Sequence, residues 1–139
     1  MRVIGLFREL GGQIDASTKS IYSMLGQLPQ DEMVPVVRYL RSGVPVFDIM
    51  EATIDPLDRV THISGGPSLV SDGTWIWRND LVYFVEKYRI GLPADFVLYA
   101  SQAVVFNGEV ALVTGKWEQI LQLYERAEKT GESHIEDQN

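Results

Sequence analysis

The chain contains no cysteine among its 139 residues. It therefore forms no disulfide, carries no thiolate nucleophile and cannot build a cysteine-rich zinc site. Histidine is nearly as scarce, because His62 and His134 are the only two and the second lies in a charged C-terminal segment. A two-histidine metal site is not expected. We predict neither a metal nor a cofactor.

The chain also lacks a long apolar run. Its N-terminal apolar stretch is interrupted by Arg8 and Glu9, which leaves it too short for a signal peptide or a membrane span. A cysteine-free composition agrees with a reducing cytosol, although it is compatible with export as well. We therefore predict a cytoplasmic protein that does not associate with membranes.

Basic residues are outnumbered in this chain. It has 12 Lys and Arg against 19 Asp and Glu, which gives a formal net charge of −7. Such a protein would repel a nucleic-acid backbone and attract a basic protein partner. A net charge of this size is also what ordinary solubility requires of a small domain. We therefore predict no nucleic-acid partner. The excess of acidic residues either attracts a basic protein or only keeps the domain soluble.

What is present is the composition of one globular domain. The chain is 45% hydrophobic and 22% charged, and its length is enough to bury a single core. No internal repeat or linker divides it. We predict a single two-layer α+β domain over residues 1–129, with helices packed on a small, mainly antiparallel sheet, and a disordered polar tail over residues 130–139.

The strongest local signal lies in residues 68–88. Asp72-Gly73 is a turn dipeptide between two groups of strand-forming residues, which predicts a hairpin with a two-residue turn. Asn79 is a candidate cap for the following helix, whose apolar residues recur at helical spacing from Leu81 to Tyr88. This segment indicates architecture and carries no catalytic signature.

The other elements are assigned from apolar periodicity and from glycine and proline breaks. The first ten residues fit a short strand or a short helix equally well. The predicted elements are helices over residues 15–25, 31–43, 94–100 and 117–129, strands over 44–54 and 60–63, and a second hairpin over 103–113.

Two tryptophans stand on one face of the predicted hairpin. Trp75 and Trp77 share that face, and Ile76 points to the other. An exposed aromatic pair would form a binding anchor, whereas a buried pair would belong to the core. The sequence leaves both interpretations open.

Four carboxylates crowd into eleven residues of the middle of the chain: Asp48, Glu51, Asp55 and Asp58. Their spacing matches neither an EF-hand loop nor a helix-borne motif, so no metal site is predicted there. They form either a solvated acidic surface or a docking patch for a cationic partner. Asp72 stands apart from them at the hairpin tip, where turn geometry alone selects aspartate.

The alternative to a binding role is catalysis through His62. This residue lies near Asp55 and Asp58 in the sequence, and such a cluster could orient an imidazole for general-base work in a small hydrolase or transferase. General acid–base chemistry needs a second placed group, and the sequence does not show one. We expect a protein that is not an enzyme, and a His62-dependent enzyme is the alternative.

Several segments resemble small bacterial immunity proteins of polymorphic toxin systems. The resemblance covers roughly residues 35–100. It is carried by Tyr39-Leu-Arg-Ser-Gly43, the acidic 48–58 segment, Gly65-Gly-Pro-Ser-Leu-Val-Ser-Asp-Gly-Thr-Trp-Ile-Trp-Arg78, Asp80-Leu-Val-Tyr-Phe-Val-Glu-Lys-Tyr88 and Leu92-Pro-Ala-Asp-Phe96. It implies a cytoplasmic antitoxin that binds one cognate toxin domain and blocks its active site or substrate access. No contact residue carries over, because immunity surfaces differ from pair to pair.

The leading hypothesis is thus an inhibitor that binds a basic protein toxin through an acidic face. The predicted partner-binding residues come from the acidic segment and the hairpin: Asp48, Glu51, Asp55, Asp58, Asp72, Trp75 and Arg78. Charge complementarity would speed association, and a few buried anchors would supply most of the affinity. We expect a monomer or a weak homodimer, the latter pairing through the edge strand near residues 44–54.

Overall fold

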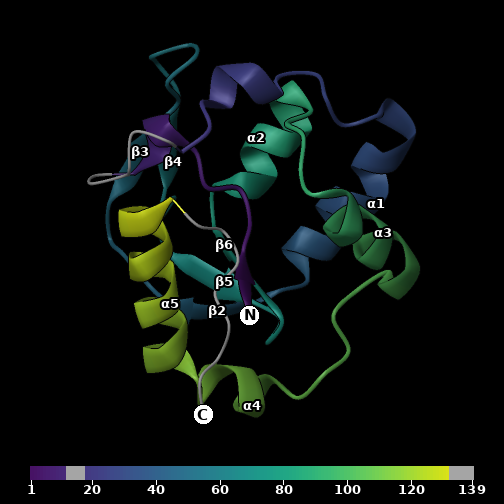
Figure 1. The fold of residues 1–139 in the computed structure, drawn as a ribbon, viewed down its shortest axis with the longest axis vertical. Coiled ribbons are helices and arrows are strands. Elements are labelled where there is room, and N and C mark those ends of the chain that lie inside the picture. The colour runs from purple at the N-terminus through teal and green to yellow at the C-terminus, as the bar shows by residue number, and fades with distance from the viewer. Residues whose placement is uncertain (12–17, 132–139) are drawn as a thin grey trace.

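A computed structural model describes residues 1–11 and 18–131 of the protein and shows one small α+β domain, as predicted (Figure 1). The helices are α1 (Gln30–Arg41), α2 (Leu81–Tyr88), α3 (Ala94–Ala103), α4 (Val110–Thr114) and α5 (Trp117–Thr130), with two 3-10 turns, η1 (Arg8–Leu10) and η2 (Ile21–Met24). The strands are β1 (Arg2–Val3), β2 (Val44–Phe47), β3 (Ala52–Ile54), β4 (His62–Ser64), β5 (Leu69–Ser71) and β6 (Trp75–Arg78).

The main sheet has the strand order β1-β6-β5-β2. β5 pairs antiparallel with both β6 and β2, whereas β1 pairs parallel with β6. β3 and β4 form a separate antiparallel pair. The sheet is therefore mainly antiparallel, as predicted, and the N-terminal strand makes it mixed.

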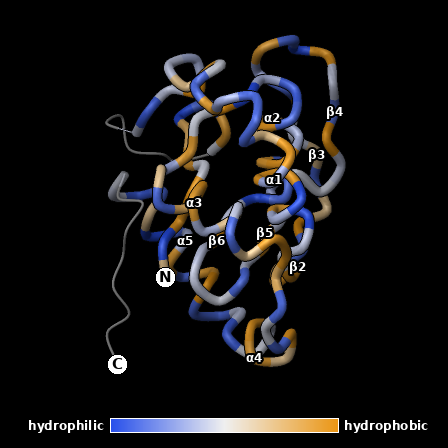
Figure 2. The backbone as a smooth tube through the Cα atoms, turned by 90° about the vertical axis from the view of Figure 1, so that its right-hand side faces the viewer, coloured by the Kyte–Doolittle hydropathy of each residue, from blue (hydrophilic) through white to orange (hydrophobic). Residues whose placement is uncertain are grey.

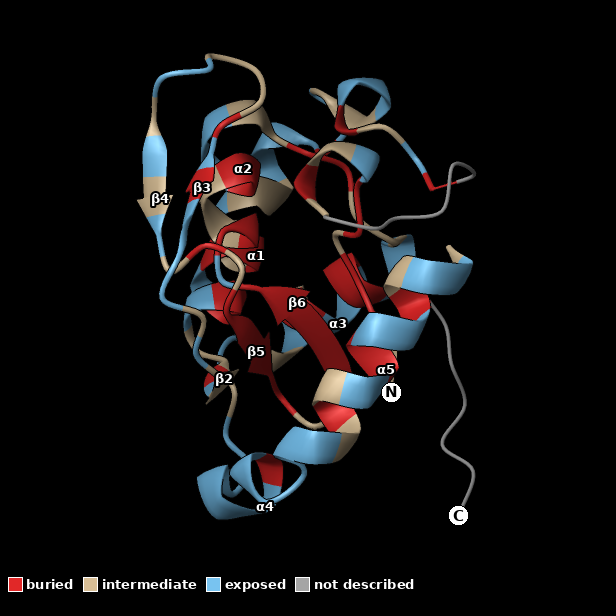
Figure 3. Ribbon diagram, turned by 90° about the vertical axis from the view of Figure 1, so that its left-hand side faces the viewer, coloured by how far each residue is buried: buried red, intermediate tan, exposed pale blue. Residues whose placement is uncertain are grey.

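Helices cover both faces of this sheet. Trp75 and Trp77 point toward α1, α2 and α3, and Ile76 points the other way toward α5. Every residue of β5 and β6 is buried, as Figure 3 shows, because each face has its own cover. The domain thus has three layers where two were predicted, and both tryptophans belong to the core.

The predicted hairpin is β5–β6, but its turn lies one residue later than expected. The Asp72 N–H donates to the Trp75 carbonyl at 3.4 Å, so Gly73 and Thr74 are the central pair. Gly73 has φ = 91°, and a type II′ turn needs this at its first central position. Asp72 caps the turn instead, because its Oδ1 accepts hydrogen bonds from the N–H groups of Thr74 and Trp75.

Two predicted strand regions fold differently. The strand expected over residues 44–54 is interrupted by residues 48–51, which separate β2 from β3. The second hairpin is absent: its first half ends α3, and its second half is the helix α4. The second hairpin was mispredicted because the periodicity of a short apolar run does not distinguish a strand from a helix.

The boundaries of two predicted helices also change. Asp80, not Asn79, precedes α2, and its side chain makes no capping bond because it is used elsewhere. Of the helix predicted over residues 15–25, the described part contains only η2, which Ser20 caps. Residues 15–17 and most of the predicted tail, 132–139, lie outside the described residues.

The core is aromatic at its centre. Figure 2 shows hydrophobic residues along the central strands and the helix segments beside them. Phe96 of α3 is fully buried and meets the rings of Tyr39, Trp75 and Trp77 at centroid distances of 6.0, 5.1 and 6.1 Å. In the described part of the chain, no helix has the length and apolar character needed to cross a membrane.

Candidate functional site

A hollow of about 330 Å³ opens between η1, the segment around β3 and the C-terminal half of α5. We call it the acidic hollow, because Glu9, Glu51 and Glu128 line it. Its other polar lining residues are Thr53, Arg78 and Tyr124. The fold therefore brings together two residues of the predicted binding set, Glu51 and Arg78, with four polar side chains that the sequence did not suggest.

A buried ion pair lies against this hollow. Arg78 donates from Nε and Nη2 to the two carboxylate oxygens of Asp80 at 3.1 and 2.7 Å. Its Nη2 also donates to Thr53 Oγ1 at 3.0 Å, and its Nη1 donates to the Leu10 carbonyl. Burial opposes the charge of Arg78, but Asp80 outweighs this and raises the pKa of the guanidinium. The hydrogen-bonding groups of Arg78 are thus used inside the domain, where they hold together the residues behind the hollow.

Glu9 is also satisfied internally. Its carboxylate accepts hydrogen bonds from Ser20 Oγ and from the Ile21 N–H. Burial opposes its ionisation, yet these bonds outweigh it and hold the pKa of Glu9 below the usual range. Glu9 therefore stays negative at neutral pH and ties η1 to η2 at one side of the hollow.

Tyr124 and Glu128, the two lining residues on α5, make no side-chain hydrogen bond to the described residues. The Tyr124 side chain is 7% exposed, and among the described residues its hydroxyl has no hydrogen-bond partner. Burial raises the pKa of this hydroxyl, so it remains protonated at neutral pH. Glu128 is half-buried, and the described residues offer it neither a hydrogen bond nor an ion pair. Burial raises the pKa of the Glu128 carboxyl, and the positive charge of the nearby Arg78 offsets this rise only in part.

Sequence reasoning missed Glu9, Tyr124 and Glu128 because they come from the two ends of the chain. One local signal was available. Tyr124 and Glu128 are four residues apart on α5, so they lie on the same side of that helix. Their meeting with β6 depends on tertiary packing, which no local pattern predicts.

Asp55 and Asp58, two of the predicted binding residues, join the β3–β4 loop to α2. Asp55 is fully buried, and its Oδ2 accepts hydrogen bonds from the hydroxyls of Tyr83 and Tyr88 at 2.7 and 2.6 Å. Asp58 accepts a bond of 2.8 Å from Lys87, which holds the pKa of Asp58 well below its usual value. Asp55 is thus a structural residue. Charge reversal there would bury an unmatched charge and damage the fold.

We expect Asp55→Asn to flatten the acid dependence of stability. Burial opposes the ionisation of Asp55, but hydrogen bonds from Tyr88 and Tyr83 outweigh it and hold its pKa below the ordinary value of 3.8. A depressed folded-state pKa adds stability above the unfolded pKa, and this is lost as the pH falls through the folded pKa. Urea unfolding at about pH 7 and about pH 3 should show a smaller difference for the variant than for the wild type. Asp48→Asn, at an exposed position, should show the same difference in stability between the two pH values as the wild type. The same difference in all three proteins would contradict the role of Asp55 in the acid dependence.

The hairpin residues of the predicted set are likewise internal. Asp72 accepts a hydrogen bond of 2.5 Å from the buried Tyr39 hydroxyl, in addition to its turn bonds. Trp75 packs against Phe96 and carries the Arg2 guanidinium 4.8 Å from its ring centroid. Asp48 and Glu51, by contrast, are exposed. Of the seven predicted residues, these two are the ones most open to a partner.

His62 is exposed on β4, and its Nδ1 lies 3.0 Å from the Val60 carbonyl oxygen. The enzymatic alternative requires an enclosed pocket around this imidazole. Within residues 1–11 and 18–131, no three His, Cys, Asp or Glu side chains come close enough to hold a metal ion. In the described part of the chain, the imidazole makes its hydrogen bond to a backbone carbonyl and to no side chain.

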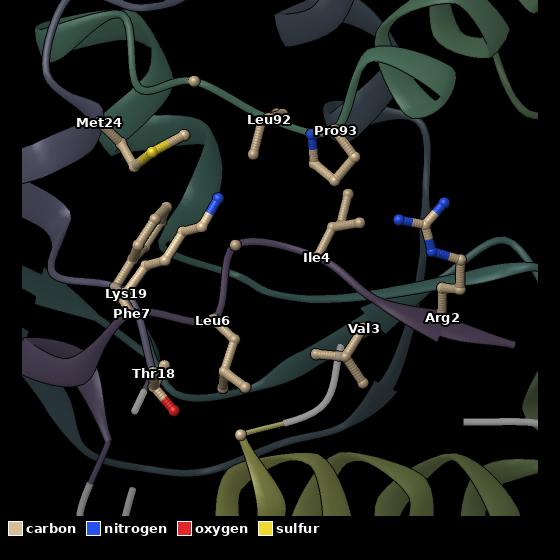
Figure 4. Close-up of a pocket in the computed structure, with 13 residues that line it drawn as sticks. Arg2, Val3, Ile4, Leu6, Phe7, Thr18, Lys19, Met24, Leu92 and Pro93 are labelled. Atoms are coloured by element: carbon tan, nitrogen blue, oxygen red, sulfur yellow. The ribbon is translucent and has the colours of Figure 1, made fainter. Parts of the chain in front are cut away.

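A second concavity, of about 460 Å³, has apolar side chains in its lining together with Arg2, Thr18 and Lys19 (Figure 4). It lies between residues 3–7 and the segment with Leu92 and Pro93, and the Lys19 side chain extends beside it. Thr18 and Gly131 line it and adjoin residues 12–17 and 132–139. Such a surface could take an apolar group bearing a negative end, but it contains none of the predicted binding residues.

Comparison with known proteins identifies no family for this arrangement. No protein-family model, curated protein or solved structure matches the chain.

Proposed function

We propose that the protein is an immunity-type inhibitor that binds a basic toxin domain and covers its active site or the path of its substrate. The observation that carries this proposal is the acidic hollow, where the Glu51 and Glu128 carboxylates form no ion pair with the described residues. Uncompensated charge at a concave surface favours a partner of opposite sign. The resemblance of residues 35–100 to immunity proteins points in the same direction.

The docking face that follows from this is smaller than the one expected from the sequence. Asp48 and Glu51 are exposed on the loop between β2 and β3, at the side of the hollow. Asp55, Asp72, Trp75 and Arg78 are buried in the fold, and Asp58 is paired with Lys87. We therefore propose that the partner contacts Asp48, Glu51 and Glu128.

Capture with the tagged protein from a lysate of the source organism tests this function. We expect one stoichiometric basic protein that is toxic when expressed alone and is neutralised when this chain is expressed with it. The variant Asp48→Lys/Glu51→Lys should bind that partner at least about tenfold more weakly at low salt, a loss of about 1.4 kcal/mol. Calorimetry or surface plasmon resonance measures the change.

The matched control is Glu109→Lys/Glu118→Lys, which makes the same charge change at exposed positions near α4, at the other end of α5. Both double variants should unfold near the wild-type midpoint, and the control should keep wild-type affinity. A captured partner that shows no toxicity, or equal weakening by both variants, would count against the proposal.

A further inference from the structure

We propose that the acidic hollow receives one arginine or lysine side chain of the partner protein, held by the carboxylates of Glu51 and Glu128 and by the Tyr124 hydroxyl. This inference rests on the proposed function and names the chemistry by which the partner is recognised. It goes beyond charge attraction, because it assigns a specific cavity to a specific kind of side chain.

The first argument is the unused bonding capacity of the hollow. A buried hydroxyl without a hydrogen bond is costly, and so is a half-buried carboxylate without a hydrogen bond or an ion pair. Tyr124 and Glu128 have these two properties, and both line the same cavity. A cationic N–H donor that entered from outside would satisfy both groups at once.

The second argument is the charge balance around the cavity. The positive charge of Arg78 is matched by Asp80, with two nitrogen–oxygen contacts of 3.1 and 2.7 Å. The three glutamates therefore leave the hollow negative. An anionic ligand would be repelled, whereas an ammonium or guanidinium group would be attracted.

The third argument separates a side chain from the other possible cations. The described residues provide no cluster of three carboxylates close enough for a metal ion. Pockets for small molecules are predominantly apolar and range from about 300 to 1,000 Å³. This hollow is near the lower limit of that range and is lined by charges, which suits the end of one long basic side chain.

Three capped tripeptides provide the test: acetyl-Gly-Xaa-Gly-amide with arginine, lysine or citrulline at the centre. Citrulline has nearly the shape of arginine but no charge. Titration followed by amide NMR should give saturable shifts around Glu51, Arg78 and Glu128 with at least one cationic peptide and none with citrulline. The absence of saturable shifts with both cationic peptides would overturn the assignment.

Two variants make the test specific. Tyr124→Phe removes only the hydroxyl, and Glu128→Gln removes only the charge. Each variant should bind the cationic peptide and the captured partner several-fold more weakly than the wild type does. Neither should lower stability much, because each removes a group that makes no hydrogen bond within the described part of the free protein. The controls are Tyr22→Phe and Glu118→Gln at exposed positions, which should bind as the wild type does.

The outcomes separate this inference from the proposed function. If a toxic partner is captured and binds Tyr124→Phe and Glu128→Gln as tightly as the wild type, the hollow is not its docking site. That result would contradict this inference but not the proposed function. Saturable and variant-sensitive peptide binding, without any toxic partner, would support the hollow and contradict the immunity function.

Discussion

Asp80→Ala should lower the free energy of unfolding by about 3–5 kcal/mol, because it leaves the Arg78 guanidinium buried without its countercharge. Asp80 is fully buried, and its Oδ2 lies 2.7 Å from Arg78 Nη2 and 2.7 Å from Thr53 Oγ1. One substitution therefore removes both the ion pair and the acceptor of a buried hydroxyl. Urea unfolding at neutral pH measures the change, with the slope of the transition checked against that of the wild type.

The double variant Arg78→Met/Asp80→Asn distinguishes an unpaired charge from a loss of packing. It removes both charges together, and an asparagine at this position can still accept from Thr53. It should be more stable than Asp80→Ala, because no buried charge is left without a partner. A double variant as unstable as Asp80→Ala would show that volume and shape, not charge, dominate at this position.

An exposed ion pair gives the scale for comparison. Arg41 and Glu86 approach to 3.0 Å, but both side chains are more than half exposed. Exposed pairs contribute about 0–1 kcal/mol, so Glu86→Ala should change stability little. A large loss in Glu86→Ala would mean that the effect of Asp80→Ala cannot be attributed to burial of its ion pair.

The elements that the sequence predicted well have strong local patterns. The β5–β6 hairpin follows from a glycine turn between strand formers, and α1 and α5 follow from apolar residues at helical spacing. The second hairpin failed because Val110 to Val113 is a short apolar run with no alternation. In the structure only Val113 of this run is buried, and the run forms α4.

The third layer could have been predicted from β6. Trp75, Ile76 and Trp77 are all large and apolar, whereas a strand with one solvated face alternates with polar residues. Three consecutive apolar residues indicate burial on both faces, which requires helices on both sides of the sheet. The cover from α5 is the consequence, and it brings Tyr124 and Glu128 to the acidic hollow.

The candidate site was only partly accessible to sequence reasoning. The acidic segment drew attention to Glu51, which lines the hollow, because charge density is visible in the sequence. It also drew attention to Asp55 and Asp58, whose partners Tyr83, Tyr88 and Lys87 lie on α2. An aspartate that binds buried hydroxyls cannot be told from a solvated one until the tertiary contacts are known.

Phe96→Ala should lower the free energy of unfolding by about 3–5 kcal/mol, the usual effect of removing a buried phenylalanine. The Phe96 ring is fully buried and meets three other aromatic rings, of which Trp75 is nearest with a tilt of 77° between the planes. Its removal would take away these edge-to-face contacts and leave a cavity between α3 and the sheet. Thermal and urea unfolding should both report the loss.

Leu98→Ala is the matched control, because Leu98 lies two residues further along α3 and is 60% exposed. It removes a large apolar side chain from the same helix without opening a cavity, so its effect should stay within about 0.5 kcal/mol. Phe96→Leu should fall between the two, because it refills part of the cavity but restores no ring contact. If Phe96→Leu were as unstable as Phe96→Ala, the aromatic contacts would dominate over volume. Equal losses in Phe96→Ala and Leu98→Ala would contradict the assignment of Phe96 to the centre of the core.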